Sequence, residues 1–441
     1  MPEQAFPLTG RGAEEPFCHR GAAGVVTVGR FLAEAQALAA RLPEAGHAVN
    51  ACADRYLAIL GFAAALLRGH PTILGAGRGG APGFLRTIAG RHPDAYAMAD
   101  GPLPDAGMPV LTLDAPLGAA PSAPMPPIPA SRIAAIAFTS GSTGTPSAHP
   151  KPWGALVAGA AAAAERFGLA GQPPGGIVAT VPPQHMYGFE TTVMLPLHAP
   201  VLVHAGDSFF PADVLAALGQ LPGRRILVTT PLHLRALLAD GRRPPALEAV
   251  ISASAPLPRE VAEAVERDWG APMLEIYGAT EAGSMASRRT LREEAWTPYA
   301  GVAVGPAGAE VPGIGLVPLA DAIEPEAGGR FRLLGRLADM VKLGGKRASL
   351  AELNRVLCGL EGVEDGAFVA PPDLGDNPSA RLIAYAVAPG LEAEAVLRAL
   401  RARLDPVFLP RRVTLLPALP RDRLGKLPAA ALAALARQDG A

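Results

Sequence analysis

Between residues 176 and 280 the chain alternates short apolar runs with amphipathic segments, and the apolar runs recur every 20 to 25 residues. The predicted strands are 176–181, 200–206, 225–230, 247–254 and 273–280, and the predicted helices between them are 212–221, 231–240 and 258–269. Parallel strands need a crossover of this length, and such crossovers are right-handed and cover both faces of a sheet. The pattern therefore predicts an α/β fold with a doubly wound, mostly parallel sheet.

The two ends of the chain extend this organisation. Helical spacing predicts helices at 30–42, 54–69 and 154–168, and 70–77 is typical of a buried strand. The proline-rich segment 115–130 predicts an extended linker. Beyond 334–347 the predicted order is helix 349–360, strands near 365–370 and 381–388, and helix 393–404. We therefore expect a large N-terminal domain at 1–335 and a small α+β C-terminal domain at 336–441.

Composition narrows the class of protein. The 441 residues are 49% hydrophobic and carry a formal net charge of −1, which argues against nucleic acid as the main partner. The longest apolar runs, 56–67 and 154–164, are too short for the roughly 18 residues that cross a bilayer. The first residues show no signal-peptide pattern, and Cys18, Cys52 and Cys358 are too far apart to suggest a disulfide framework. We expect a cytoplasmic protein without membrane insertion, and buried free thiols.

A loop of hydroxyls and glycines, "TSGSTG" at 139–144, directly follows an apolar run. Its backbone N–H groups and hydroxyls could converge on an anion, although a solvated Ser/Gly loop has the same composition. It is not the lysine-containing P-loop of nucleotide triphosphatases. A second glycine run, "GAGRGG" at 75–80, fits a dinucleotide-binding loop only weakly, because glycine is frequent throughout the chain.

The segment "IYGATEAG" at 276–283 places Glu281 just beyond a predicted buried strand. Ligands bind at the carboxyl ends of parallel strands, and a carboxylate there could hold Mg²⁺ against phosphates. A solvated glutamate in a turn is the alternative interpretation.

Taken together, the motifs resemble one family. "TSGSTG", "IYGATE", Asp321, "GRLADMVKLGGKR" and "LPRDRLGKL" occur in the order of the adenylate-forming superfamily, which includes acyl-CoA synthetases, adenylation domains and luciferases. Asp321 also precedes Arg336 by 15 positions, as in that family. The resemblance covers residues 50 to 430 and implies the fold of these enzymes, with a C-terminal domain that rotates between two half-reactions.

The resemblance also implies roles for single residues. The phosphate loop falls on 139–144, the adenine-stacking ring on Tyr277, and the magnesium ligand on Glu281. The implied catalytic residues are Lys426, Glu281, Thr280 and His185. The implied nucleotide-binding residues are Thr139, Ser140, Gly141, Ser142, Thr143, Gly144, Lys151, Ser254, Ala255, Tyr277, Gly278, Asp321, Arg336 and Lys342. His185 lies in "PPQHMYG" and would line the acyl pocket, unless it is a hydrogen-bonded core histidine.

Two positions depart from the family pattern. The family has a lysine where this chain has Ser147, and the next positive charge is Lys151. We expect Lys151 to reach back toward the phosphates, because a lysine is a flexible point charge. The usual charged hinge residue falls on Ala338, beside Asp339, which leaves the position of the hinge open.

The implied reaction uses ATP and Mg²⁺ to adenylate a small, aromatic carboxylic acid and transfers the acyl group to a phosphopantetheine thiol. "SAHPK", "MASRR" and the C-terminal "LPRRVTLLPALPRDRLGKLP" resemble the compact ligases of aryl-polyene and xanthomonadin pigment clusters, which load hydroxybenzoate-type acids onto an acyl carrier protein. We therefore expect an acyl carrier protein as partner. The alternatives are an aryl- or acyl-CoA synthetase that uses free CoA, a nucleotide-binding homologue without activity, and a dinucleotide oxidoreductase.

Overall fold

The structure is a computed structural model of the chain. It describes residues 3–44, 46–75, 82–114, 125–139, 147–206, 208–343, 345–371, 374, 381–420 and 435. The chain forms two compact units, unit 1 with residues 1–318 and 326–331 and unit 2 with residues 319–325 and 332–441. The expected division into an AMP-binding domain at 1–335 and a mobile domain at 336–441 stays a prediction, because compactness alone shows neither function nor movement.

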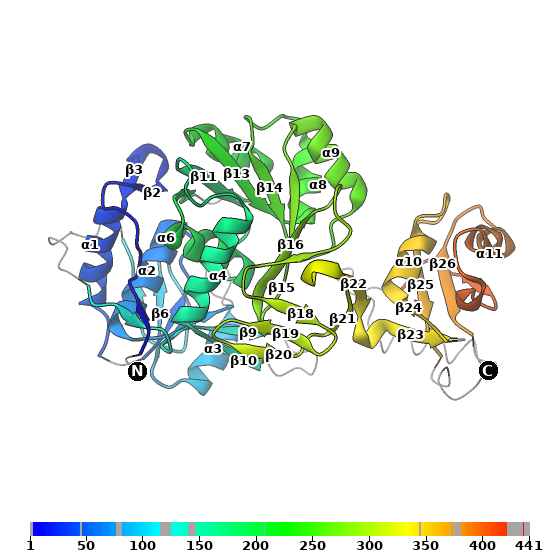
Figure 1. The fold of residues 1–441 in the computed structure, drawn as a ribbon, viewed down its shortest axis with the longest axis horizontal. Coiled ribbons are helices and arrows are strands. Elements are labelled where there is room, and N and C mark those ends of the chain that lie inside the picture. The colour runs from blue at the N-terminus through cyan, green and yellow to red at the C-terminus, as the bar shows by residue number, and fades with distance from the viewer. Residues whose placement is uncertain are drawn as a thin grey trace. The chain divides into compact units, whose positions relative to one another are not determined.

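Unit 1 contains a nine-stranded sheet in the order β17-β16-β15-β14-β13-β11-β12-β2-β3. The strands are β2 (Pro16–His19), β3 (Val25–Thr27), β11 (Gly175–Ala179), β12 (Val201–His204), β13 (Arg224–Thr229), β14 (Ala249–Ser252), β15 (Met273–Ala279), β16 (Gly283–Arg289) and β17 (Thr297–Pro298). The six strands from β15 to β2 are parallel, and β16, β17 and β3 run antiparallel to their neighbours. The helices α7 (Pro211–Gln220), α8 (Pro231–Asp240) and α9 (Arg259–Trp269) lie beside this sheet (Figure 1). Their apolar residues form one buried cluster with residues of its strands.

The second sheet of unit 1 has six strands in the order β10-β9-β5-β4-β6-β7. The strands are β4 (His47–Asn50), β5 (Thr72–Leu74), β6 (Ala95–Ala99), β7 (Val110–Thr112), β9 (Ile133–Thr139) and β10 (Ser147–Pro152). All are parallel except β10, which pairs antiparallel with β9. The sequence predicted the strand at 70–77, observed as β5, and the apolar run before residue 139, observed as β9, whereas β4, β6 and β7 were not predicted.

A large apolar core joins the two sheets. It includes residues of both sheets and of α1 (Val28–Ala39), α2 (Arg55–Arg68), α4 (Trp153–Arg166), α5 (Met186–Phe189), the π-helix η2 (Glu190–Met194) and α6 (Leu195–His198). The outer face of the six-stranded sheet packs against α3 (Pro82–Arg91). Residues next to α2 in the sequence cap both of its ends. The Asp54 side chain accepts a hydrogen bond from the Leu57 backbone N–H at the start of the helix, and Gly69, with φ of 88°, ends it.

Smaller sheets complete both units. Unit 1 has the pair β1 (Ala5–Phe6) and β8 (Ile128–Pro129) and the antiparallel sheet of β18 (Ala303–Gly305), β19 (Gly308–Val311) and β20 (Gly315–Val317). Unit 2 contains β21 (Asp321–Pro325), β22 (Phe331–Arg336) except its first residue, β23 (Met340–Leu343), β24 (Lys346–Ser349), β25 (Asp365–Val369), β26 (Ile383–Val387) and β27 (Val413–Leu415). Helices α10 (Leu350–Cys358) and α11 (Ala393–Arg401) pack with the last three strands around one core, so the predicted α+β character is confirmed.

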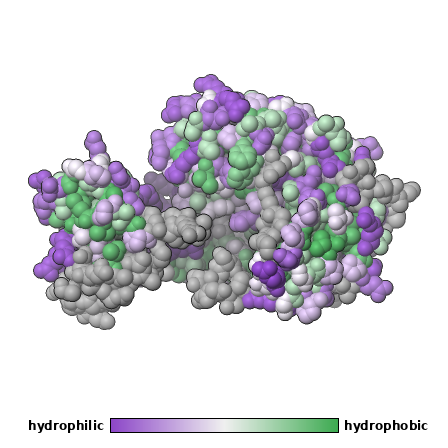
Figure 2. All heavy atoms as spheres, turned by 180° about the vertical axis from the view of Figure 1, so that it is seen from behind, coloured by the Kyte–Doolittle hydropathy of each residue, from purple (hydrophilic) through white to green (hydrophobic). Residues whose placement is uncertain are grey.

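The helices and the surface of the molecule bear on the expectation that no segment crosses a membrane. Among the described residues no helix is both long and apolar enough to span a membrane. Figure 2 shows hydrophilic and hydrophobic residues intermixed over the face of unit 1 that it presents. None of the three cysteines forms a disulfide, and Cys18 and Cys52 are buried, as expected, whereas Cys358 is exposed. Cys358 is exposed because it is the last residue of α10, on the side away from the core residues Leu353 and Leu357.

Candidate active site at the carboxyl edge of the parallel strands

Three parallel strands bring predicted site residues of unit 1 to one edge of the nine-stranded sheet. Strand β15 ends just before Thr280 and Glu281, β14 is followed by Ser254 and Ala255, and β11 by the segment that contains His185. These strands and β13 are parallel neighbours, so their carboxyl ends share an edge. This is where ligands bind in such sheets. The structure thus brings these residues to one edge of the sheet, and their roles stay predictions.

Glu281 lies in a tight turn between β15 and β16. The turn is closed by a hydrogen bond from the Ala282 backbone N–H to the Ala279 carbonyl, 3.1 Å. The Glu281 side chain is half-buried, and among the described residues it has no hydrogen-bond or ion-pair partner. A carboxylate whose two oxygens have no partner among the described residues fits a Mg²⁺ ligand at such an edge.

Lys151 is bonded to the backbone of this turn. Its side chain is 1% exposed, and its Nζ donates a hydrogen bond of 2.5 Å to the backbone carbonyl of Glu281. Burial lowers the pKa of Lys151 to about 8, although the carboxylates of Glu190 and Glu281 oppose this shift. Lys151 is thus a buried cation beside the proposed magnesium ligand. Its expected contact with phosphates stays a prediction.

Glu190 is bonded to Ser284, which follows the Glu281 turn at the start of β16. Its carboxylate accepts hydrogen bonds from the backbone N–H and the hydroxyl of Ser284, at 3.0 and 2.5 Å. Burial raises the pKa of Glu190, and the bonds to Ser284 act in the opposite direction. Gly283, with φ of 85°, passes so close that a Cβ there would lie 2.5 Å from Glu190 Oε1. The sequence analysis missed Glu190, although a single charge within the apolar segment "MYGFETTVMLPL" was a usable signal.

A small cavity of about 30 Å³ adjoins Lys151 and Glu190. This is room for one water molecule or two. Apolar residues of α4 and of the segment 299–314 form most of its wall, and Lys151, Glu190, Ser284 and Tyr299 are its polar members. The Tyr299 hydroxyl is buried and has no hydrogen-bond partner among the described residues. Sequence inspection gave no indication of this cavity.

The segment that contains His185 connects the carboxyl edges of the two sheets. The Tyr187 hydroxyl lies 3.2 Å from the Thr229 carbonyl and 2.9 Å from the Ile251 carbonyl, at the ends of β13 and β14. On the other side, Gln184 accepts from the Gly75 backbone N–H just after β5. His185 itself is exposed, so it is not the core histidine that we considered as an alternative. Its place at this edge is compatible with a contact to substrate.

Two further predicted nucleotide contacts lie on the same edge. Tyr277 is 8% exposed, and its ring lies 5.7 Å from the centroids of both Trp296 and Phe331. Ser254 is exposed and has φ of 75°, an unusual backbone conformation for a residue other than glycine. Such strained positions often occur at functional sites.

The remaining predicted residues lie in unit 2 or outside the description. Within unit 2, Asp321 and Arg336 form an ion pair of 3.2 Å, so the predicted pair does lie together. Lys342 is exposed on β23. The side chain of Thr139, residues 140–144 of the expected phosphate loop, and Lys426 are outside the described residues. Their roles stay predictions.

The chain resembles known proteins in both sequence and fold. A 4-coumarate–CoA ligase from Rhodobacter capsulatus is 34% identical over 302 residues, which are 66% of this chain and 74% of the relative. The solved structure of ATP-bound MatB from Rhodopseudomonas palustris has a TM-score of 0.76, with 19% identity and 96% of each chain covered. The O-succinylbenzoate coenzyme A synthetase MenE from Bacillus subtilis, in complex with ATP and a magnesium ion, has a TM-score of 0.73 at 17% identity and covers 94% of this chain and 95% of its own.

These structures confirm the predicted fold, that of adenylate-forming enzymes. The profile of the family described as "AMP-binding enzyme" matches residues 85–318, which include β9, α4 and every strand from β11 to β20. That range contains Lys151, Glu190 and the Glu281 turn. The chain therefore belongs to the AMP-binding enzyme family of adenylate-forming acid–thiol ligases.

Proposed function

We propose that this protein activates an aromatic carboxylic acid with ATP and Mg²⁺ and joins it to the thiol of coenzyme A. The observation that carries the proposal is the Glu281 turn, a free carboxylate at the carboxyl edge of the parallel strands within the region matched by the family. The choice of CoA follows the names of the relatives, two of which are 4-coumarate–CoA ligases. These names support the alternative of a CoA synthetase better than our expectation of a carrier protein.

In the first step a carboxylate oxygen of the acid forms a bond to the α-phosphorus of ATP, and the bond from that phosphorus to the bridging oxygen breaks, so pyrophosphate leaves. We assign Glu281 to hold Mg²⁺, which would neutralise phosphate charge. The Thr280 hydroxyl would donate to the α-phosphate, and Lys151 and Glu190 would keep the turn in place. This assignment rests on positioning and charge, the main terms in reactions at phosphorus.

In the second step the thiol sulfur forms a bond to the acyl carbon, the bond from that carbon to the phosphate oxygen breaks, and AMP leaves.

We assign Asp321 and Arg336 to binding of the ribose of ATP, since a carboxylate can accept hydrogen bonds from two hydroxyls. Lys426 is assigned to the first step, as the family resemblance implies.

The aromatic preference now rests on the relatives rather than on the aromatic residues beside His185. Tyr187 and Phe189 are buried, and the Phe189 ring packs edge-on against Phe62 at 4.9 Å. These rings therefore build the core. The 4-coumarate named for the relatives is an aromatic acid, which supports the same class for this chain.

Transfer to a carrier protein, as in the pigment-cluster ligases that the motifs resemble, is kept as a second candidate because of one observation. The exposed arginines of unit 2 include Arg398, Arg401, Arg403, Arg411 and Arg412, which lie close together in the sequence. A basic surface of this kind would favour an acidic partner and make transfer sensitive to salt.

The test measures pyrophosphate release from ATP across benzoates, cinnamates and fatty acids, followed by acyl transfer to CoA and to an acidic acyl carrier protein at matched concentrations. We expect release with aryl acids and faster transfer to CoA. Release with fatty acids alone would contradict the aromatic class. Faster transfer to the carrier protein, lost at high salt, would favour the second candidate.

A further inference from the structure

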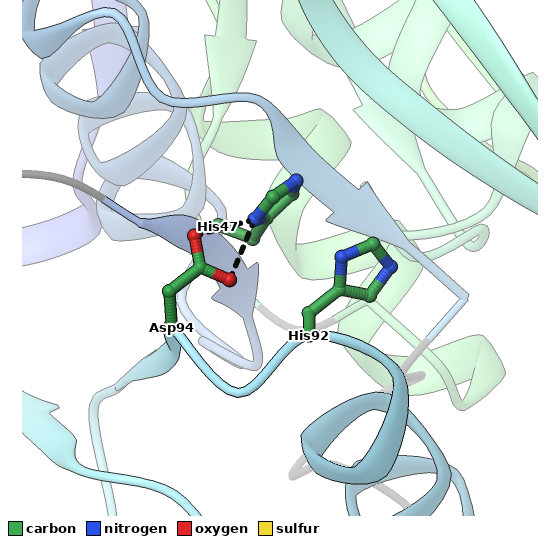
Figure 3. A group of neighbouring side chains, drawn as sticks. All are labelled: His47, His92 and Asp94. Atoms are coloured by element: carbon green, nitrogen blue, oxygen red, sulfur yellow. Dashed lines mark hydrogen bonds and ion pairs between the residues drawn. The ribbon is translucent and has the colours of Figure 1, made fainter.

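Two histidines and one aspartate of unit 1 converge away from the candidate active site (Figure 3). His47 is the first residue of β4, and His92 and Asp94 lie between α3 and β6. One nitrogen of each histidine and one carboxylate oxygen all lie within 4.8 Å of one another. We propose that these three side chains form a binding site for a divalent transition metal ion, best matched by Zn²⁺.

The backbone fixes all three positions. The His92 N–H bonds to the Ile88 carbonyl at the end of α3, and the Ala95 N–H bonds to the His92 carbonyl, which closes a turn around Asp94. His47 stands opposite Ala95 in the parallel pairing of β4 with β6. The chain before His47 can approach this turn because residue 46 is glycine, where a Cβ would lie 2.7 Å from the Asp94 carbonyl oxygen. The three side chains are therefore brought together by the fold.

The donor set selects the class of metal. Imidazole nitrogens with a carboxylate suit zinc and its neighbours, whereas Mg²⁺ prefers oxygen ligands alone. His47 Nδ1 lies 2.9 and 3.0 Å from the two Asp94 oxygens, and the rings of His47 and His92 are 4.3 Å apart. Ligand atoms around a tetrahedral zinc ion are about 3.4 Å apart at the usual bond lengths. The side chains of His92 and Asp94 are both partly accessible to solvent, and small rotations of them would bring the ligand atoms to this spacing.

The charged and titratable residues around His47, His92 and Asp94 are the candidates for further metal ligands. His70 lies nearby, but its Nδ1 bonds to the Tyr96 hydroxyl at 3.0 Å and its Nε2 to the Glu44 carbonyl at 3.3 Å. The guanidinium of Arg91 adds positive charge beside His92 and opposes cation binding. Three protein ligands thus remain, and water would complete the coordination.

The position of the three ligands separates this site from catalysis. Strand β4 is parallel to β5, and β5 to β9, after which the expected phosphate loop begins. His47 stands at the amino end of β4, so it lies at the opposite edge of the sheet from the carboxyl end of β9. A metal ion here would join β4 to the turn before β6 and stabilise unit 1, without taking part in adenylation.

The experiment measures Zn²⁺ binding to the full chain by equilibrium dialysis in excess Mg²⁺, with Co²⁺ absorption as a report on the ligands and thermal unfolding as a report on stability. The variants are His92→Gln and Asp94→Asn. The matched control is Asp240→Asn, since Asp240 forms an ion pair with Arg242 in another part of unit 1. We expect one bound Zn²⁺ and a raised Tm for wild type and Asp240→Asn. Both site variants should bind about 10- to 100-fold more weakly or worse, since even indirect partners of a metal have effects of that size.

Two results would overturn the proposal. One is a wild-type protein that binds no Zn²⁺ in stoichiometric amount. The other is Zn²⁺ binding that persists unchanged in both site variants, since the ion would then be held elsewhere. A site variant that fails to fold is replaced by His47→Gln, whose side chain is 26% exposed and caps no helix.

Discussion

The ammonium group of Lys151 and the backbone carbonyl of Glu281 are joined by a hydrogen bond of 2.5 Å, although 130 residues separate them in the chain. Lys151 lies on the edge strand of one sheet, and Glu281 follows a strand of the other. The bond therefore connects the two sheets at the point where the proposed magnesium ligand is presented. Fixing the carbonyl of Glu281 also limits where its carboxylate can lie.

Replacing Lys151 by Met removes the donor and keeps a side chain of similar length. We expect kcat/KM for adenylation to fall about 10²-fold, because a displacement of about 1 Å in a reacting group has an effect of this size. The Mg²⁺ concentration needed for half-maximal ATP–pyrophosphate exchange should rise. Lys346→Met is the control, since Lys346 is exposed in unit 2 and pairs with Asp405.

The dependence on Mg²⁺ separates positioning from a purely structural role. If Lys151→Met lowers the Tm but leaves the Mg²⁺ requirement unchanged, the lysine supports the fold and not the metal ligand.

Glu190→Ala should destabilise the protein more than Glu190→Gln. Alanine leaves the N–H and the hydroxyl of Ser284 without their acceptor, and such a loss costs about 1–3 kcal/mol. Glutamine keeps one carbonyl acceptor and removes only the charge beside Lys151. Denaturant unfolding of both variants checks the order, and equal stability of the two would contradict the role of Glu190 as the acceptor for Ser284.

These two buried charges also show what the sequence could and could not predict. The helices and strands that the sequence predicted were observed within a few residues, because local periodicity determines them, whereas β4, α3, β6 and β7 were not predicted. The order of motifs placed Thr280 and Glu281 in a site. The partners of Lys151, Glu190 and Tyr187 are 130, 94 and 64 residues away, respectively, and depend on which strands become neighbours. Spacing along a single sequence does not contain that information.

His198 should make the protein less stable in mild acid. Its ring packs 5.3 Å from that of Trp153, its Nε2 has no partner among the described residues, and burial lowers its pKa to about 4. Between pH about 6.5 and 4 the unfolded chain binds a proton that the folded chain excludes, so stability falls as pH falls through this window. Above pH 6.5 the neutral form dominates in both states, and the full stability is present.

The corresponding variant is His198→Gln, which cannot be protonated. The shift in pKa corresponds to an upper limit of about 3 kcal/mol, so the variant should flatten the dependence of unfolding free energy on pH by up to this amount. His149→Gln, on the edge strand β10, is the control. An unchanged slope between pH 4 and 6.5 in His198→Gln would show that other groups account for the acid sensitivity.

Finally, Lys426→Ala should separate the two half-reactions. The family resemblance implies that this lysine contacts the carboxylate and the α-phosphate during adenylation only, and loss of one preorganised contact of that kind typically costs on the order of 10²–10³ in rate. The variant should make almost no adenylate from ATP and acid, yet it should transfer the acyl group from preformed adenylate at a near-normal rate. Gly345→Leu should show the reverse pattern, because Gly345, with φ of 82°, lies in the "KLGG" segment that the resemblance assigns to the thiol step. Single-turnover kinetics of each step on both variants decide the matter. Equal loss of both steps in Lys426→Ala would mean that the lysine supports the fold, or that unit 2 presents the same face in both reactions.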